Sequence, residues 1–153
     1  MIDSHCHLNL SPLGEMLNDV IGSAMQSGVT RIMAPGITVQ SWKTLQQFSE
    51  RYRGSFPIDT ALGLHPYFLT PSQKTTAEHD VVLSHQINEL EDAASNLHFS
   101  VKAIGETGLD GHIDVPMQIQ KRALQAQLSI ANSVKLLRLF CTTEKVITCY
   151  LRH

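Results

Sequence analysis

Four short apolar segments, each followed by a longer segment with helical spacing, constrain the fold of this chain most strongly. The apolar segments cover residues 1–8, 30–35, 58–64 and 99–104. Strands that alternate with helices pair in parallel, because each helix returns the chain to the same end of the sheet. The pattern therefore predicts an α/β fold of about four βα units.

The predicted helices carry start and stop signals. The first follows a capping Ser and a first-turn Pro at residues 11–12 and ends before Gly28, and the second is expected to be capped by Ser41. The third opens with a capping box at residues 75–78, and the fourth follows Pro116. Apolar residues at helical spacing form the expected buried faces: Leu17, Val20, Ile21 and Ala24; Trp42, Leu45, Phe48 and Tyr52; Leu83, Ile87, Leu90 and Ala94; Ala123, Leu124, Leu128 and Ala131.

The length of the chain decides between two parallel architectures. A complete (β/α)₈ barrel needs about 250 residues, so 153 residues with four βα units correspond to the first half of a TIM-type barrel. The alternative is a small doubly wound sheet, which usually has a glycine-rich phosphate turn after its first strand. Histidines occupy that position in this chain, which favours the partial barrel.

Charge and composition exclude several classes of protein. The formal net charge is -2, and the 12 Lys and Arg residues are scattered, so no basic patch for nucleic acid or anionic lipid is predicted. There is no basic leader before an apolar run and no stretch of about eighteen apolar residues. The three cysteines form no disulfide framework. We therefore expect a cytoplasmic protein with reduced thiols and no membrane contact, and we infer no protein partner.

Polar residues at the ends of three predicted strands are the candidate functional residues. His5 and His7 stand two residues apart in an extended segment, so both imidazoles leave the same face and can bind one cation. Glu106 and His65 end the fourth and third strands, and the carboxyl ends of barrel strands meet at one rim. There His65 could bind a metal, contact a phosphate or transfer protons. The alternatives are a polar strand end, a solvated turn histidine and a glutamate in a loop salt bridge.

The remaining histidines and two aspartates receive lesser roles. We expect His79, His85 and His98 to lie on the outer face of the third helix or near it, without a function. Asp3 and Asp110 are candidates for orienting a neighbouring ligand.

Three motifs together resemble the TatD family of metal-dependent hydrolases, in this order and spacing. They are DSHCH at residues 3–7, GLHP at residues 63–66 and IGETGLD at residues 104–110. The segment QAQLSIA at residues 125–131 strengthens the resemblance, which covers residues 1–136.

The resemblance implies a metallo-dependent-hydrolase barrel whose rim binds divalent metal ions, two in the complete enzyme, chosen among Mg²⁺, Mn²⁺ and Zn²⁺. Such a site activates water against phosphodiesters, so DNA or another phosphoester is the implied substrate and deoxyribonuclease the implied activity. By their match to the motifs, His5 and His7 are implied metal ligands, and Glu106 is a bridging and catalytic carboxylate. His65 is an implied substrate-binding residue near the phosphate.

Residues 137–153 depart from the family. The resemblance implies a fifth strand of the form Leu-Pro-Val-x-x-His-x-Arg and a later His and Asp, whereas these residues show neither helical nor strand spacing. Joining the last base of each codon from Leu137 onward to the first two bases of the next codon allows Pro-Val-Ile-Leu-His-His-Arg. We therefore predict an out-of-frame tail over residues 137–153.

A chain cut short in this way is expected to be catalytically inactive and weakly stable, with a loosely packed tail. Two other functions stay open. One is an amidohydrolase that acts on a small amide or lactone, and the other is a metal-binding fragment without catalysis.

Overall fold

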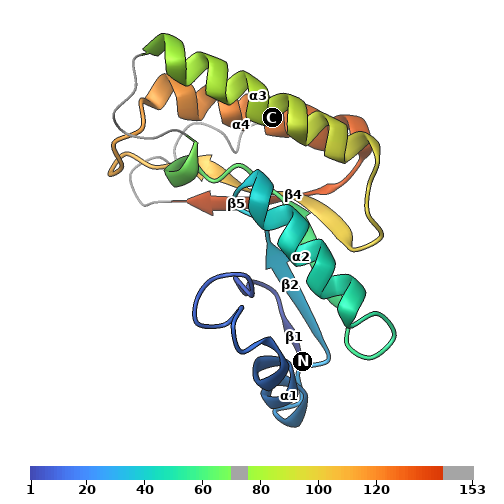
Figure 1. Cartoon of the computed structure of the whole chain (residues 1–153). Coiled ribbons are helices and arrows are strands. Elements are labelled where there is room, and N and C mark those ends of the chain that lie inside the picture. The colour runs from blue at the N-terminus through green and yellow to red at the C-terminus, as the bar shows by residue number, and fades with distance from the viewer. Residues whose placement is uncertain (70–75, 143–153) are drawn as a thin grey trace.

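The computed structural model in Figure 1 describes residues 1–69 and 76–142. Its five strands form one sheet in the order β1-β2-β3-β4-β5, and every neighbouring pair is parallel. This arrangement confirms the predicted α/β sheet. In chain order the elements are β1 (Ile2–Asp3), α1 (Leu17–Gln26), β2 (Arg31–Pro35), α2 (Val39–Arg51), β3 (Ile58–Leu62), the 3₁₀ turn η1 (Pro66–Phe68), α3 (Thr76–Ser95), β4 (Val101–Leu109), α4 (Met117–Val134) and β5 (Leu137–Thr142).

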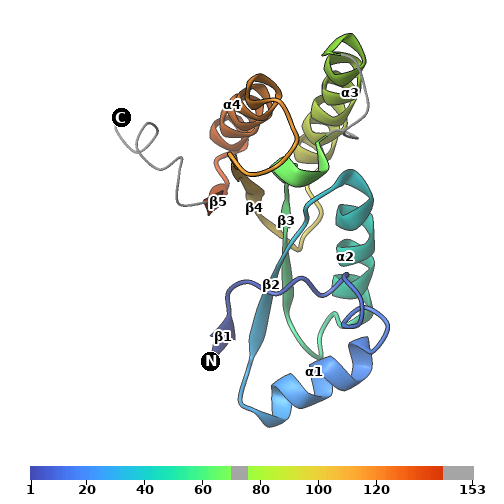
Figure 2. The ribbon, with the colours of Figure 1, turned by 90° about the vertical axis from the view of Figure 1, so that its left-hand side faces the viewer.

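The helices lie on one side of the sheet, as Figure 2 shows. Alternate residues of the strands face them: in β2, Ile32 and Ala34 are buried while Arg31 and Met33 are half-buried. The core has two parts. One packs α1 and α2 against β2 and the start of β3, and the other packs α3 and α4 against β3 and β4.

Ten of the sixteen residues predicted for the buried faces of the helices are buried, and five more, Val20, Ala24, Phe48, Tyr52 and Ile87, are half-buried and packed against the core. Leu45 of α2 and Leu83 and Leu90 of α3 have no exposed surface. In α4, however, Leu128 is half-buried and Gln127 is 1% exposed. The apolar pattern does not predict that Gln127 is buried more deeply than Leu128. An amide is buried only where it finds hydrogen-bond partners, and the spacing of apolar residues does not reveal those partners.

The predicted outer position is wrong for His79, which is 5% exposed. His79 stands one helical turn before Leu83 and therefore belongs to the buried stripe of α3. His85 is exposed on the same helix, as expected.

Three predicted boundaries shift for local reasons. α1 begins at Leu17, because residues 11–16 form turns in which the Met16 N–H donates to the Pro12 carbonyl. α2 is capped by Thr38, and Ser41 completes the capping box three residues later. β1 has two residues, although the Cys6 N–H still donates to the Met33 carbonyl of β2 (3.0 Å). The predicted capping box of α3 begins at residue 75, outside the described residues.

β4 continues to Leu109, five residues past its predicted end, because β5 pairs with it from Ala103↔Leu137 to Leu109↔Thr142. The expectation that the tail lacks a strand is therefore wrong for Leu137–Thr142. Residues 143–153, which carry the rest of that prediction, lie outside the described residues. Among the helices that the structure describes, none has the length and apolar character to cross a bilayer.

Candidate metal centre

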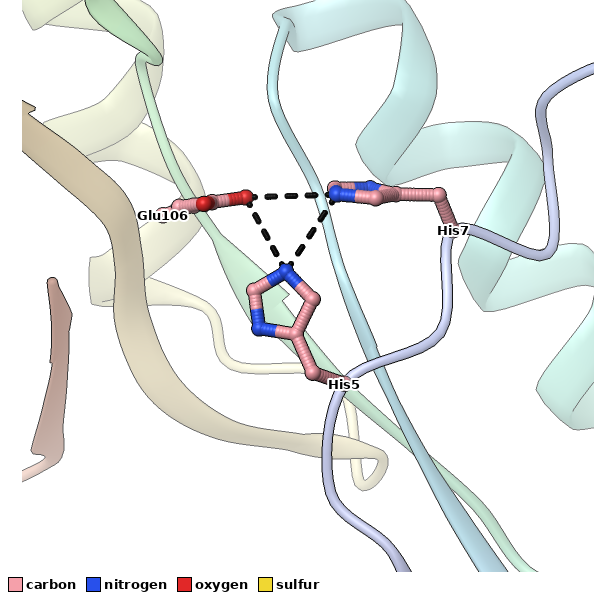
Figure 3. Close-up of side chains that lie close together, drawn as sticks. All are labelled: His5, His7 and Glu106. Carbon is pink, nitrogen blue, oxygen red and sulfur yellow. Dashed lines mark hydrogen bonds and ion pairs between the residues drawn. The ribbon is translucent and has the colours of Figure 1, made fainter. Parts of the chain in front are cut away.

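Three side chains from the ends of β1 and β4 point into one space (Figure 3). His5 and His7 follow β1 in an extended segment, and Glu106 lies within β4. The structure thus brings together the three residues predicted as metal ligands, although β1 and β4 are not neighbours in the sheet. Curvature of the sheet carries their carboxyl ends toward each other, as in a barrel rim.

The three ligand atoms form a triangle with equal sides. The Nε2 atoms of His5 and His7 are 3.3 Å apart, and each lies 3.3 Å from Oε2 of Glu106. Ligand atoms around a tetrahedral zinc ion with bonds of about 2.0–2.1 Å are separated by about 3.3–3.4 Å. The triangle therefore has the size of one face of such a coordination shell.

The burial of Glu106 supports the same interpretation. Glu106 is 8% exposed, and its Oε2 makes no hydrogen bond of acceptable geometry although two imidazole nitrogens lie near it. A buried carboxylate oxygen without a donor is costly. A divalent cation would satisfy this oxygen and both nitrogen lone pairs, so the residues fit a metal.

Cys6 explains how the two histidines share a face. Its side chain packs against the cluster of β2, α1 and α2, so its neighbours in the extended segment turn to the opposite face. Burial, and then the charge of Asp3, raise the pKa of the Cys6 thiol. Asp3 accepts a hydrogen bond from the backbone N–H of His5 (3.1 Å), and its predicted orienting role stays a prediction.

Glu106 is placed by an unusually close approach of β3 to β4. A Cβ atom at Gly63 would lie 2.2 Å from the Glu106 nitrogen, so no larger residue fits there without moving a strand. The Glu106 N–H donates to the Gly36 carbonyl (3.3 Å). Gly105 has φ +135°, in the region that favours glycine. Glycines on both strands, Gly63 and Gly105, thus accompany this close approach.

His65 lies beside the three ligands without joining them. It caps η1, where its Nδ1 accepts from the Tyr67 N–H (3.2 Å), so the neutral ring carries its proton on Nε2. Burial lowers the pKa of His65; Glu106 opposes this shift, and the neighbouring His7 and His5 add to it. His65 thus shares the electrostatic environment of the candidate centre. Its predicted substrate-binding role stays a prediction.

Asp110 does not orient a ligand through any contact seen among the described residues. Its side chain accepts from the His112 N–H (2.8 Å), and its backbone bonds to Gln120. The residues that sequence reasoning missed are Gln120 and Gln127, which are both 1% exposed and bond to the backbone at the ends of β4 and β3. The sequence did carry a signal for Gln127, because this residue lies in the segment already singled out at residues 125–131.

Comparison with known proteins agrees with this geometry. The family model described as "TatD related DNase" matches residues 2–140. The uncharacterized metal-dependent hydrolase YabD of Bacillus subtilis is 33% identical over 137 residues, which are 89% of this chain and 48% of that protein. The 3'-5' ssDNA/RNA exonuclease TatD of Citrobacter koseri is 28% identical over 138 residues, 89% of this chain and 47% of its own.

A solved structure extends the comparison to the fold. The crystal structure of YJJV, a TatD homolog from Escherichia coli K12, matches with a TM-score of 0.76 and 29% identity. The match covers 92% of this chain and 49% of that one. It confirms the predicted partial (β/α)₈ barrel. The chain spans about half the length of the relatives it matches.

Gly63→Ala tests the close approach that places Glu106. Because the added Cβ meets backbone at 2.2 Å, we expect the free energy of unfolding to fall by about 1–3 kcal/mol and zinc affinity to fall about tenfold or more. Chemical denaturation and titration calorimetry measure the two effects. The control is Gly22→Ala in α1, where a Cβ meets nothing within 4 Å and a gain of about 0.5–1 kcal/mol is expected. Wild-type stability and affinity in Gly63→Ala would contradict this account.

The pKa of His65 can be followed by NMR titration of its ring in chelator-treated protein. We expect a midpoint below 6.5, the ordinary value, because burial disfavours the cation. In Glu106→Gln the midpoint should fall further, since that carboxylate opposes the shift. With a folded pKa below the unfolded one, His65 lowers stability as the pH falls from the unfolded value to the folded one. A midpoint above 6.5, or an upward move in Glu106→Gln, would refute this environment.

Proposed function

The chain belongs to the family of TatD-related DNases, and from that membership we propose that it forms part of a divalent-metal-dependent hydrolase that cleaves phosphodiester bonds in nucleic acid. The triangle of His5, His7 and Glu106 is the observation that carries the proposal. When bound, a metal in this position would supply a Lewis acid for the phosphoryl oxygen and an acidified water.

The donor set favours certain ions. Two imidazoles suit Zn²⁺ better than Mg²⁺, which prefers oxygen ligands. Three protein ligands leave coordination positions for water and substrate, which is the pattern of catalytic rather than structural sites. The two oxygens of Glu106 would allow this carboxylate to bridge two ions, the number that the family resemblance implies.

His65 would act on the substrate rather than on the metal. With Nδ1 occupied by the Tyr67 N–H, its Nε2–H is free to donate to a phosphate oxygen. The lowered pKa of His65 keeps the ring neutral at pH 7, so it would serve as a hydrogen-bond donor and not as a charge.

A nucleic acid substrate agrees with the relatives, one of which is named an ssDNA/RNA exonuclease. The chain itself has a net charge of -2 and scattered cations, so the positive charge that attracts a phosphate would come from the metal. Binding of this kind depends on a few phosphates near the ion and should be less sensitive to salt than binding through a basic patch.

We further propose that the metal centre is completed by residues beyond the four βα units. Among the described residues the group holds His5, His7 and Glu106 and no fourth ligand. Three ligands bind more weakly than four or five, so this chain should bind metal with modest affinity and show little turnover. The reading-frame change near residue 137 stays a proposal, and DNA sequencing across codons 134–140 tests it directly.

Metal binding is the first measurement. His5→Ala and Glu106→Gln should each weaken Zn²⁺ or Mn²⁺ binding in calorimetry by about 100-fold or more, since each removes one of three ligand atoms. The matched control is His85→Ala, which removes an exposed histidine of α3 and should leave affinity unchanged. Equal affinity in all four proteins would remove these residues from a metal site.

Activity is measured on single-stranded and double-stranded DNA with and without chelator. We expect metal-dependent cleavage in the frame-restored protein and little in the 153-residue chain. His5→Ala and Glu106→Gln should lower turnover of the restored protein about 100-fold or more. Cleavage of amides or lactones but not of DNA would favour the amidohydrolase. Metal binding without any hydrolysis in the restored protein would favour a non-catalytic role.

A further inference from the structure

The pairing of β3 with β4 ends before it reaches the candidate centre. The last paired residues are Leu62 and Ile104, whereas on its other edge β4 stays paired with β5 as far as Leu109. Both residues of interest lie beyond this point: His65 follows β3 and caps η1, and Glu106 lies within β4. Something other than the backbone ladder must therefore fix the distance between the two residues.

The amide of Gln127 replaces the missing ladder. Its Oε1 accepts from the Leu64 N–H (2.8 Å), and its Nε2 donates to the Leu64 carbonyl (3.1 Å). The same Nε2 donates to Oγ1 of Thr107 (2.6 Å). Leu64 directly precedes His65 and Thr107 directly follows Glu106, so one side chain ties together the neighbours of both residues.

Burial makes these bonds hard to replace. Gln127, Leu64 and Thr107 are each at most 2% exposed, so water cannot take over the bonds of the Leu64 N–H and carbonyl. The adjacent backbone groups already have partners: the Gly63 carbonyl accepts from Trp42 Nε1 (2.9 Å), and the His65 N–H donates to the Ile37 carbonyl (3.1 Å).

We propose that Gln127 is a positioning residue that sets the spacing between Glu106, in the metal centre, and His65, beside it. The inference rests on the proposed function for its meaning, since it concerns the same site. It adds a residue of α4 that touches neither metal nor substrate.

Gln120 provides a matched control. It is the same residue type on the same helix, equally buried, and its amide also bonds to backbone: it accepts from the Asp110 N–H (2.7 Å) and donates to the carbonyls of Asp110 (3.0 Å) and Val115 (2.8 Å). These bonds fix the loop after β4 and reach no neighbour of His65 or Glu106.

The test uses Co²⁺ as the probe metal in the 153-residue chain. We expect Gln127→Met to weaken Co²⁺ binding about 10–100-fold, as other supporting partners of metal ligands do, and to change the visible absorption of bound Co²⁺. Gln120→Met should lower the thermal midpoint and leave both Co²⁺ properties unchanged. Unchanged Co²⁺ binding in Gln127→Met, or equal losses in the two variants, would overturn the proposal.

A second pair of variants guards against unfolding. Thr107→Val removes only the hydroxyl that accepts from Gln127, and Thr107→Ser restores it with a smaller side chain. The proposal expects the Val variant to lose Co²⁺ affinity and the Ser variant to recover it. Loss in both variants would indicate packing rather than positioning and would contradict the proposal.

Failure of the metal site itself is distinguishable. If the wild-type chain binds no Co²⁺, the proposed function fails in this chain, and the positioning role is decided on metal-free protein by NMR. Gln127→Met should then shift the Glu106 amide signal and speed exchange of the Leu64 amide, whereas Gln120→Met, which disturbs the loop at Asp110, should do neither. Wild-type signals and exchange in Gln127→Met would overturn the positioning role independently of any metal.

Discussion

The contact between β3 and β4 governs the rest of the site. Gly63 lets the two strands approach so closely that a Cβ would lie 2.2 Å from the Glu106 nitrogen. Beyond that contact the Glu106 carboxylate meets His5 and His7, which follow β1 (Figure 3). A carboxylate held on a strand is fixed more firmly than one on a loop, which would suit the role proposed for Glu106.

Polar networks hold this strand pair at both ends. At its beginning, Thr60 and Ser100 share a hydrogen bond (2.9 Å), Ser100 bonds to His98 (2.8 Å), and His98 reaches Glu50 of α2 (3.1 Å). The register between β3 and β4 shifts just after Thr60, and these side-chain bonds add to the backbone bond from the Thr60 N–H to the Ser100 carbonyl (2.8 Å). At the other end Gln127 performs the equivalent task. The middle of the pair is apolar and packs on α3 and α4.

The sequence predicts those features that depend on a repeated pattern. Alternating apolar segments and helices predict the parallel sheet, and a spacing of two residues predicts that His5 and His7 share a face. Features that depend on one particular hydrogen-bond partner cannot be predicted from such a pattern. Burial of Gln127 depends on unpaired backbone at Leu64, which exists only because the β3–β4 ladder stops at Leu62. Thr38 and Ser41 are both hydroxyl residues near the start of α2, and only the path of the backbone decides which one caps it.

Residues 137–142 show most clearly what a sequence pattern cannot predict. Residues 137–142 have no alternation that predicts a strand, yet their backbone pairs with β4 over five positions. β5 pairs along the edge of β4 that lies opposite β3, and without β5 the N–H and C=O groups of this edge would be unpaired. An open parallel edge of this kind accepts almost any extended segment through backbone bonds alone. The pairing of β5 therefore follows from the open edge of β4 and does not require that residues 137–142 favour a strand. It carries no information on whether these residues are read in their original frame.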